Sequence, residues 1–84
     1  MREKVVLITG ANGEIGHGLI QHLAKTTEAN IVALDVVPLD KSLRQLCSTY
    51  IVGDILDQML LGRLVVEHEI ATIYHLASIL STKA

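Results

Sequence analysis

The chain has 84 residues, which is enough for one small domain and excludes a stable two-domain enzyme. Half of its residues are hydrophobic and 19% are charged, so the composition excludes a disordered tail and indicates a packed interior. With a net charge of −2 and scattered lysine and arginine residues, the chain offers no basic stripe for nucleic acid or for an anionic membrane surface.

The first predicted element is a β-strand at Val5–Ile8, a continuous apolar run that is typical of a strand buried on both faces. This run ends after four residues at Thr9-Gly10, which is too short for the core of a signal peptide. No run approaches the roughly 18 apolar residues that span a bilayer. We therefore expect a cytoplasmic protein without a membrane partner.

An amphipathic helix is predicted from Glu14 to about Lys25, directly after a glycine-rich turn. Its apolar residues recur at spacings of three and four, and they are Ile15, Leu19, Ile20, Leu23 and Ala24. A second apolar run, Ile31–Leu34, predicts the next buried strand, and Asp35 follows it directly.

Two helices and two strands are predicted in the second half of the chain. Asp40 can cap a helix over Lys41–Cys47, and a strand at Tyr50–Val52 follows it. Asp57 can cap another helix, whose apolar face holds Leu60, Leu61, Leu64, Val65 and His68. The fourth strand is predicted at Ala71–Ala77, and Ser78–Ala84 forms either a loop or the start of a further helix.

Strands and helices therefore alternate along the chain, without a linker or an internal repeat. Because crossovers between parallel strands are right-handed, this order predicts an α/β fold in a single domain, residues 1–84. The expected architecture is a partial Rossmann-type, doubly wound parallel sheet with four strands in the order 3-2-1-4 and three helices.

The glycine turn at residues 10–16 is the first candidate site. It follows a buried strand, opens a helix, and precedes an acidic residue that stands 19 positions after Gly16. One glycine allows the tight turn, one lets a diphosphate approach the backbone, and one allows close packing of helix and strand. The diphosphate would then lie on the N–H groups at the start of the helix. The alternative is a turn that only reverses the chain. The candidate cofactor-binding residues here are Gly10, Asn12, Gly13, Glu14, Ile15 and Gly16.

Asp35 is the candidate ligand for the adenosine ribose of a dinucleotide. Its carboxylate can accept hydrogen bonds from both ribose hydroxyls and would repel a 2′-phosphate. Val36 and Val37 follow it, so no adjacent basic residue reverses this preference. The expected cofactor is therefore NAD rather than NADP. In the alternative interpretation Asp35 is an ordinary solvated acid at the end of a strand.

The ends of the third and fourth strands should meet the same edge of the sheet, where ligands of doubly wound folds bind. Asp54 is expected to hydrogen-bond the adenine amino group while Ile55 packs on the ring, and the alternative for Asp54 is a turn or capping acid. Small residues are expected beside the pyrophosphate and the nicotinamide ribose, and these are Leu76, Ala77 and Ser78.

No residue is assigned a catalytic or metal-binding role. His75 lies on a predicted buried strand without a partner acid, so we interpret it as packed and hydrogen-bonded. Ser78 lacks the surroundings of a nucleophile, and Cys47 is interpreted as a small apolar residue. The remaining histidines lack metal-ligand spacing and are expected at the surface or its boundary: His17, His22 and His68.

Taken together, these motifs resemble the N-terminal half of an extended short-chain dehydrogenase/reductase, a group that includes the NAD-dependent epimerases and dehydratases. The resemblance covers almost the whole chain and rests on Thr9–Gly16, Asp35, Gly53–Ile55 and His75–Ser78. It implies that the three turn glycines bind pyrophosphate, Asp35 binds ribose, Asp54 and Ile55 bind adenine, and Leu76 and Ala77 line the cofactor. Residues Ile79–Ala84 are more similar to the threonine 3-dehydrogenase and sugar-acid dehydrogenase branches than to the sugar-nucleotide epimerases.

The chain departs from this group because it has no Tyr-x-x-x-Lys pair to move the proton that accompanies hydride transfer. Tyr50 is followed four residues later by Asp54, and Tyr74 by Ser78. We therefore expect the chain to be inactive alone. The favoured interpretation is the N-terminal piece of an oxidoreductase or epimerase that acts on a sugar nucleotide or a small hydroxy compound. The alternatives are a complete nucleotide-binding or regulatory module and a structural domain that binds nothing. Whether the parent protein is a homodimer stays open.

Overall fold

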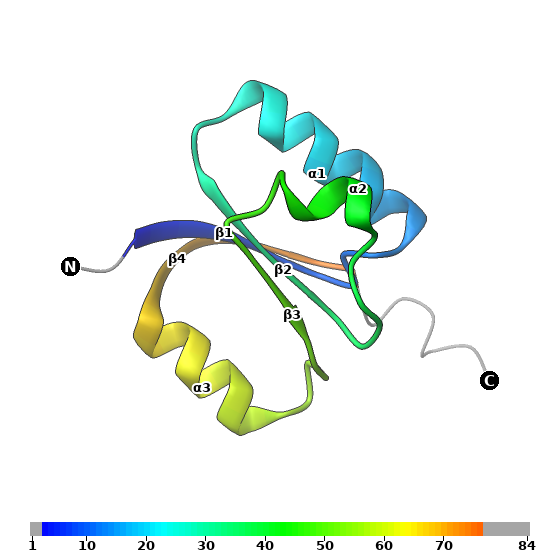
Figure 1. Ribbon diagram of the computed structural model, residues 1–84. Helices are drawn as coiled ribbons and strands as arrows, with labels where there is room; N and C mark the ends of the chain where they lie inside the picture. Colours follow the sequence, from blue (N-terminus) through cyan, green and yellow to red (C-terminus); the bar gives the residue numbers. More distant parts are fainter. Residues whose placement is uncertain (1–2, 77–84) are drawn as a thin grey trace.

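A computed structural model describes residues 3–76, which form seven elements joined by short connections (Figure 1). In chain order these are β1 (Glu3–Thr9), α1 (Glu14–Thr26), β2 (Asn30–Asp35), α2 (Lys41–Arg44), β3 (Thr49–Val52), α3 (Gln58–Glu67) and β4 (His68–His75). All four strands are parallel and lie in the order β3-β2-β1-β4. The predicted α/β fold, strand order and number of helices are confirmed.

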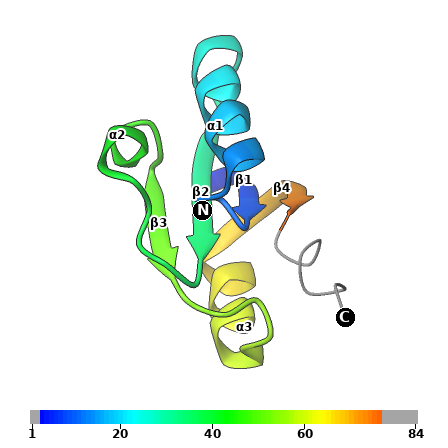
Figure 2. The same cartoon turned by 90° about the vertical axis from the view of Figure 1, so that its right-hand side faces the viewer.

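The sheet is covered by helices on both faces. Helices α1 and α2 lie on one face and α3 lies on the other, and the view in Figure 2 separates these layers. Successive side chains of a strand point to opposite faces, so β1 sends Val6 and Ile8 towards α1 and α2, and Val5 and Leu7 towards α3. A strand covered on both faces requires an unbroken apolar run, which is what the sequence of β1 provides.

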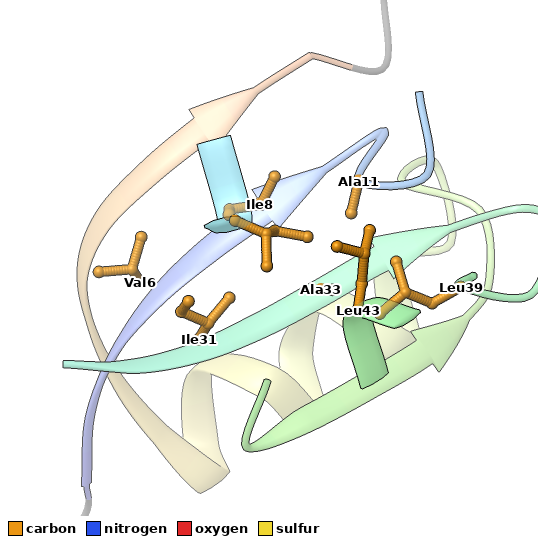
Figure 3. Packing of buried hydrophobic residues seen from close by; sticks show 8 residues of the cluster. Val6, Ile8, Ala11, Ile31, Ala33, Leu39 and Leu43 are labelled. Carbon is orange, nitrogen blue, oxygen red and sulfur yellow. The ribbon is translucent and has the colours of Figure 1, made fainter. Parts of the chain in front are cut away.

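Two hydrophobic clusters result. The larger lies under α1 and α2 (Figure 3) and contains Val6, Ile8, Ala11, Ile20, Ile31, Ala33, Leu39 and Leu43. The smaller lies under α3 and contains Val5, Leu7, Val32, Leu34 and Leu64. A fully buried isoleucine such as Ile8 contributes about 1.5–3 kcal/mol relative to an exposed one. Most residues of the two clusters belong to the central strands β1 and β2, so these strands supply most of the core.

Helix α1 faces the sheet with a narrower stripe than the apolar pattern predicted. Gly16 and Ile20 are buried and Leu23 is partly buried, whereas Ile15 and Ala24 are exposed. Close packing of Gly16 against Ala11 fixes the rotation of the helix, so that residues 16, 20 and 23 face the core. The prediction that Ile15 and Ala24 belong to the buried face was wrong.

Helix α2 is shorter than the predicted helix over Lys41–Cys47. After Arg44 the backbone continues as turns, in which the N–H of Leu46 bonds to the carbonyl of Leu43 and the N–H of Cys47 to that of Arg44. Such tighter bonds end an α-helix early, yet Leu46 and Cys47 still pack against the larger cluster.

Strand β4 begins and ends earlier than the predicted strand Ala71–Ala77. No loop separates it from α3, so His68 is the first residue of the strand and not part of the helical face. Its pairing with β1 changes register between Val5 and Val6, because eight residues of β4 run beside seven of β1.

The expected burial of β4 was also wrong. This strand lies at the edge of the sheet, where His68 and Ile70 are half-buried and its other residues are exposed. Ile73 on β4 is 57% exposed, and Val65, predicted on the buried face of α3, is 55% exposed. Within residues 3–76, no helix is both long enough and apolar enough to cross a bilayer.

Candidate functional site

The glycine turn joins β1 to α1 at the carboxyl edge of the sheet. Gly10 has a φ of 69°, in the left-handed region that favours glycine. The N–H groups of Gly10 and Ala11 both donate to the carbonyl oxygen of Leu34, at 2.9 and 3.2 Å. These two bonds tie the turn to β2, so its geometry is fixed by the neighbouring strand.

The two later glycines serve different needs. A Cβ on Gly16 would overlap the carbonyl oxygen of Ala11 and lie 2.7 Å from its carbonyl carbon, so only glycine allows this approach of helix and turn. Gly13 is the N-cap of α1, and a Cβ there would have only the carbonyl oxygen of Gly10 as a close neighbour, at 3.5 Å. No side chain of the described residues caps the helix.

The start of α1 is therefore open. The first N–H groups of a helix have no partner inside it and carry a partial positive charge, which suits a diphosphate. Glu14 and Ile15, the first two helical residues, are both exposed, and Ile15 is 66% exposed although it is apolar. An apolar side chain at this place is available to a ligand.

Asp35 ends β2 directly beside the turn. Its Oδ2 accepts a hydrogen bond from the N–H of Asn12 at 2.9 Å, and its Oδ1 accepts one from the N–H of Val37 at 3.2 Å. Both carboxylate oxygens are thus oriented by main-chain groups, and each keeps a second lone pair for a ligand. The structure therefore places an oriented carboxylate beside the glycine turn, and its role in binding ribose stays a prediction.

Residues after β3 lie next along the same edge, because the N–H of Gly53 donates to the carbonyl of Asp35 at 2.9 Å. Asp54 Oδ1 accepts from the N–H of Leu56 at 2.9 Å, which makes it a turn acid, and the exposed carboxylate has further lone pairs. Ile55 is half-buried and packs against the smaller cluster. The adenine contacts assigned to these two residues stay predictions.

At the end of β4, His75 Nδ1 lies 2.7 Å from the hydroxyl of Thr9, and the N–H of Leu76 donates to the carbonyl of Thr9 at 3.0 Å. The predicted hydrogen bond of His75 is confirmed, but its side chain is exposed on the edge strand. Leu76 packs against the larger cluster. Ala77 and Ser78 lie outside the described residues, as do Ile79–Ala84.

Two hydrogen-bonded pairs of this site, Thr9 with His75 and Asp40 with Asn12, were not predicted from the sequence. Thr9 is buried and polar at the end of an apolar strand, which is a signal that it needs a partner. The side chain of Asn12 reaches the loop before α2, where its Oδ1 accepts from the N–H of Asp40 at 2.8 Å. No sequence pattern points to that contact, since 28 residues separate the two.

Charge in the site is shaped by main-chain hydrogen bonds. The N–H and hydroxyl of Ser42 donate to Asp40 and hold the pKa of its carboxyl below the usual range, with a smaller contribution from the charge of His17. Within residues 3–76, no group of three or more His, Cys, Asp or Glu side chains could hold a metal ion.

Comparison with known proteins adds to this geometry. The profile of the NAD dependent epimerase/dehydratase family matches residues 6–84. The chain belongs to this family. A search of curated proteins finds no match.

Among solved structures, this member of the epimerase/dehydratase family is similar to MoeE5 in complex with UDP-glucuronic acid and NAD. The two are 36% identical, with a TM-score of 0.66 over 86% of this chain. The chain spans only 22% of the MoeE5 chain, so the match covers a part of that protein and not the whole of it.

Proposed function

We propose that this chain binds NAD and forms the nucleotide-binding, N-terminal part of an enzyme that acts on a sugar nucleotide or a small hydroxy compound. The observation that carries the proposal is the Asp35 carboxylate, which accepts a hydrogen bond at 2.9 Å from the main chain of the glycine turn. A ribose on this carboxylate would extend its 5′-diphosphate towards the open start of α1.

In this proposal the pyrophosphate binds the main chain of the turn, with Gly10, Asn12, Gly13, Glu14, Ile15 and Gly16 as the contributing residues. The absence of a Cβ on Gly13 lets the diphosphate approach, and the helix dipole contributes about 0.3–1 kcal/mol. The rest of the cofactor lies along the carboxyl edge, beside Leu76, Ala77 and Ser78.

Asp35 gives the preference for NAD. A 2′-phosphate would stand beside a carboxylate whose two oxygens are both oriented by main-chain N–H groups, and the like charges would repel each other. The neighbouring Val36 and Val37 are exposed and apolar, so they offer no compensating cation and suit the adenosine ring system. Asp54 and Ile55 complete the proposed adenine site.

When bound, NAD accepts and returns a hydride at its nicotinamide. The residues of this chain bind and orient the cofactor, and the sequence holds no Tyr-x-x-x-Lys pair to move the accompanying proton. The proposal that a longer parent protein supplies that pair is supported by the 22% coverage of MoeE5. The UDP-glucuronic acid in the MoeE5 complex supports a sugar nucleotide as the substrate class.

The test compares NAD and NADP by titration calorimetry with the unchanged chain, Asp35→Asn and Glu28→Gln. Glu28 follows α1 at the opposite edge of the sheet, so its substitution removes one negative charge away from the proposed site. We expect the unchanged chain and Glu28→Gln to prefer NAD, and Asp35→Asn to lose about tenfold of that preference. Equal affinity of the unchanged chain for both cofactors would contradict the role of Asp35.

A further inference from the structure

The loop between β2 and α2, residues 36–40, is fastened to the glycine turn at both of its ends. At the first end, the N–H groups of Asn12 and Val37 donate to the two oxygens of Asp35. At the second end, Asn12 Oδ1 accepts from the N–H of Asp40 at 2.8 Å. One residue, Asn12, takes part in both attachments.

The second attachment also fixes the start of α2. The carboxylate of Asp40 accepts from the N–H and the hydroxyl of Ser42, so the main chain at Asp40 cannot move without disturbing the helix cap. Leu39 and Leu43, on either side of it, are buried in the larger cluster. The amide of Asn12 therefore bonds to a rigid point of the fold.

Between its two ends the loop is exposed, at Val36, Val37 and Pro38. The N–H of Val37 is one of the two groups that orient the Asp35 carboxylate, so movement of the loop moves that carboxylate. His17, near the start of α1, also approaches this amide: its Nε2 lies 3.4 Å from Asn12 Oδ1. The asparagine amide thus joins the turn, the loop and the helix around Asp35.

We propose that the side chain of Asn12 is a positioning residue for recognition of the ribose: it holds the loop at 36–40 so that Asp35 presents its free lone pairs to the 2′-hydroxyl. This inference rests on the proposed NAD site and adds to it a residue that acts through Asp35. Its amide oxygen is used inside the protein, so its effect falls on the ribose and not on the diphosphate.

The test uses ADP and 2′-deoxy-ADP, which share the diphosphate and adenine and differ in one hydroxyl. A hydrogen bond to a carboxylate gives the unchanged chain a preference for ADP of about tenfold. We expect Asn12→Ala to reduce this ratio to about threefold or less. Ser42→Ala removes a neighbouring hydroxyl but keeps the bond between Asn12 and Asp40, so it should retain the ratio.

Asn12→Asp is the second variant, because it keeps an oxygen that can accept from the N–H of Asp40. It should retain the ratio while binding both nucleotides more weakly, since its added charge repels the diphosphate. A ratio that is unchanged in Asn12→Ala, or lost in Asn12→Asp, would overturn the role of Asn12. Failure of the unchanged chain to bind ADP at all would instead overturn the proposed NAD site.

Discussion

Gly16 and Gly18 lie two residues apart in α1, but their surroundings differ: Gly16 is packed closely against the main chain and Gly18 faces open space. A Cβ on Gly16 would run into main-chain atoms of Ala11, which cannot move aside because Ala11 is itself bonded to Leu34. A Cβ on Gly18 would meet nothing within 4 Å. The spacing of glycines in the sequence shows where a close approach is needed, but only the packed helix shows which neighbour it meets.

Gly16→Ala should therefore lower the free energy of unfolding by about 3 kcal/mol through overpacking against a rigid backbone. Gly18→Ala, the matched control, should raise it by about 0.5–1 kcal/mol, because alanine restricts the unfolded chain and suits a helix interior. Urea unfolding of both variants measures these changes. Similar effects of the two substitutions would contradict the close contact of Gly16.

The site was predictable residue by residue only where the chemistry is local. The turn glycines and Asp35 follow from their position at the ends of apolar runs, and the structure brings them together as expected. The bond from Asp40 to Asn12 joins two loops that are 28 residues apart in the sequence, so no local pattern contains it.

The sequence predicted which helices and strands exist more accurately than it predicted where they end. Helix α2 stops at Arg44 because tighter turns replace it, although the apolar spacing continues to Cys47. The start of β4 at His68 was not predictable, because no glycine or proline marks the boundary between α3 and this strand. Helix starts were more distinct, since Asp40 and Asp57 both cap as predicted.

Asp57→Ala should lower the free energy of unfolding by about 1 kcal/mol. The carboxylate accepts from the N–H groups of Met59 and Leu60, both at 3.1 Å, and alanine would leave them to water. Asp57→Asn keeps an accepting oxygen and should retain most of the stability. Thermal unfolding of the two variants distinguishes them, and an equal loss in both would show that the cap contributes through its charge alone.

At the scale of the molecule, the order of the sheet was predictable because right-handed crossovers leave few arrangements for four parallel strands. The coverage of the sheet was not. Apolar residues of β4 and α3 predicted burial, yet Ile73 and Val65 are exposed in the described part of the chain. An apolar run indicates a strand that prefers burial, and it carries no information on which segment would cover it.

The reactivity of the Cys47 thiol differs between the folded and the unfolded chain and can therefore report on unfolding. Burial raises the pKa of its thiol from 9.0 to about 11, so the folded state favours the neutral form. The stability that this contributes is fully present below about pH 9 and is lost as the pH rises towards 11.

At pH 9, about half of the thiol is ionised in the unfolded chain and about 1% in the folded chain. Because the thiolate is the nucleophile, alkylation by iodoacetamide at this pH should be about 50-fold slower in the folded chain than in concentrated urea. Mass spectrometry follows both reactions. Equal rates under the two conditions would mean that Cys47 is not shielded by the cluster beneath α2.

The change of register between β1 and β4 sets what stands opposite the last residue of β1. Val5 pairs with Ile70, and if the pairing continued one residue for one residue from there, Thr9 would pair with Tyr74. Ala71 acts as a one-residue spacer that advances the rest of β4, so that Thr9 meets His75 and their hydrogen bond forms. Ala71 lies far from the turn and has no polar side chain. Its position in β4 nevertheless determines which side chain of β4 forms a hydrogen bond with Thr9, next to Gly10.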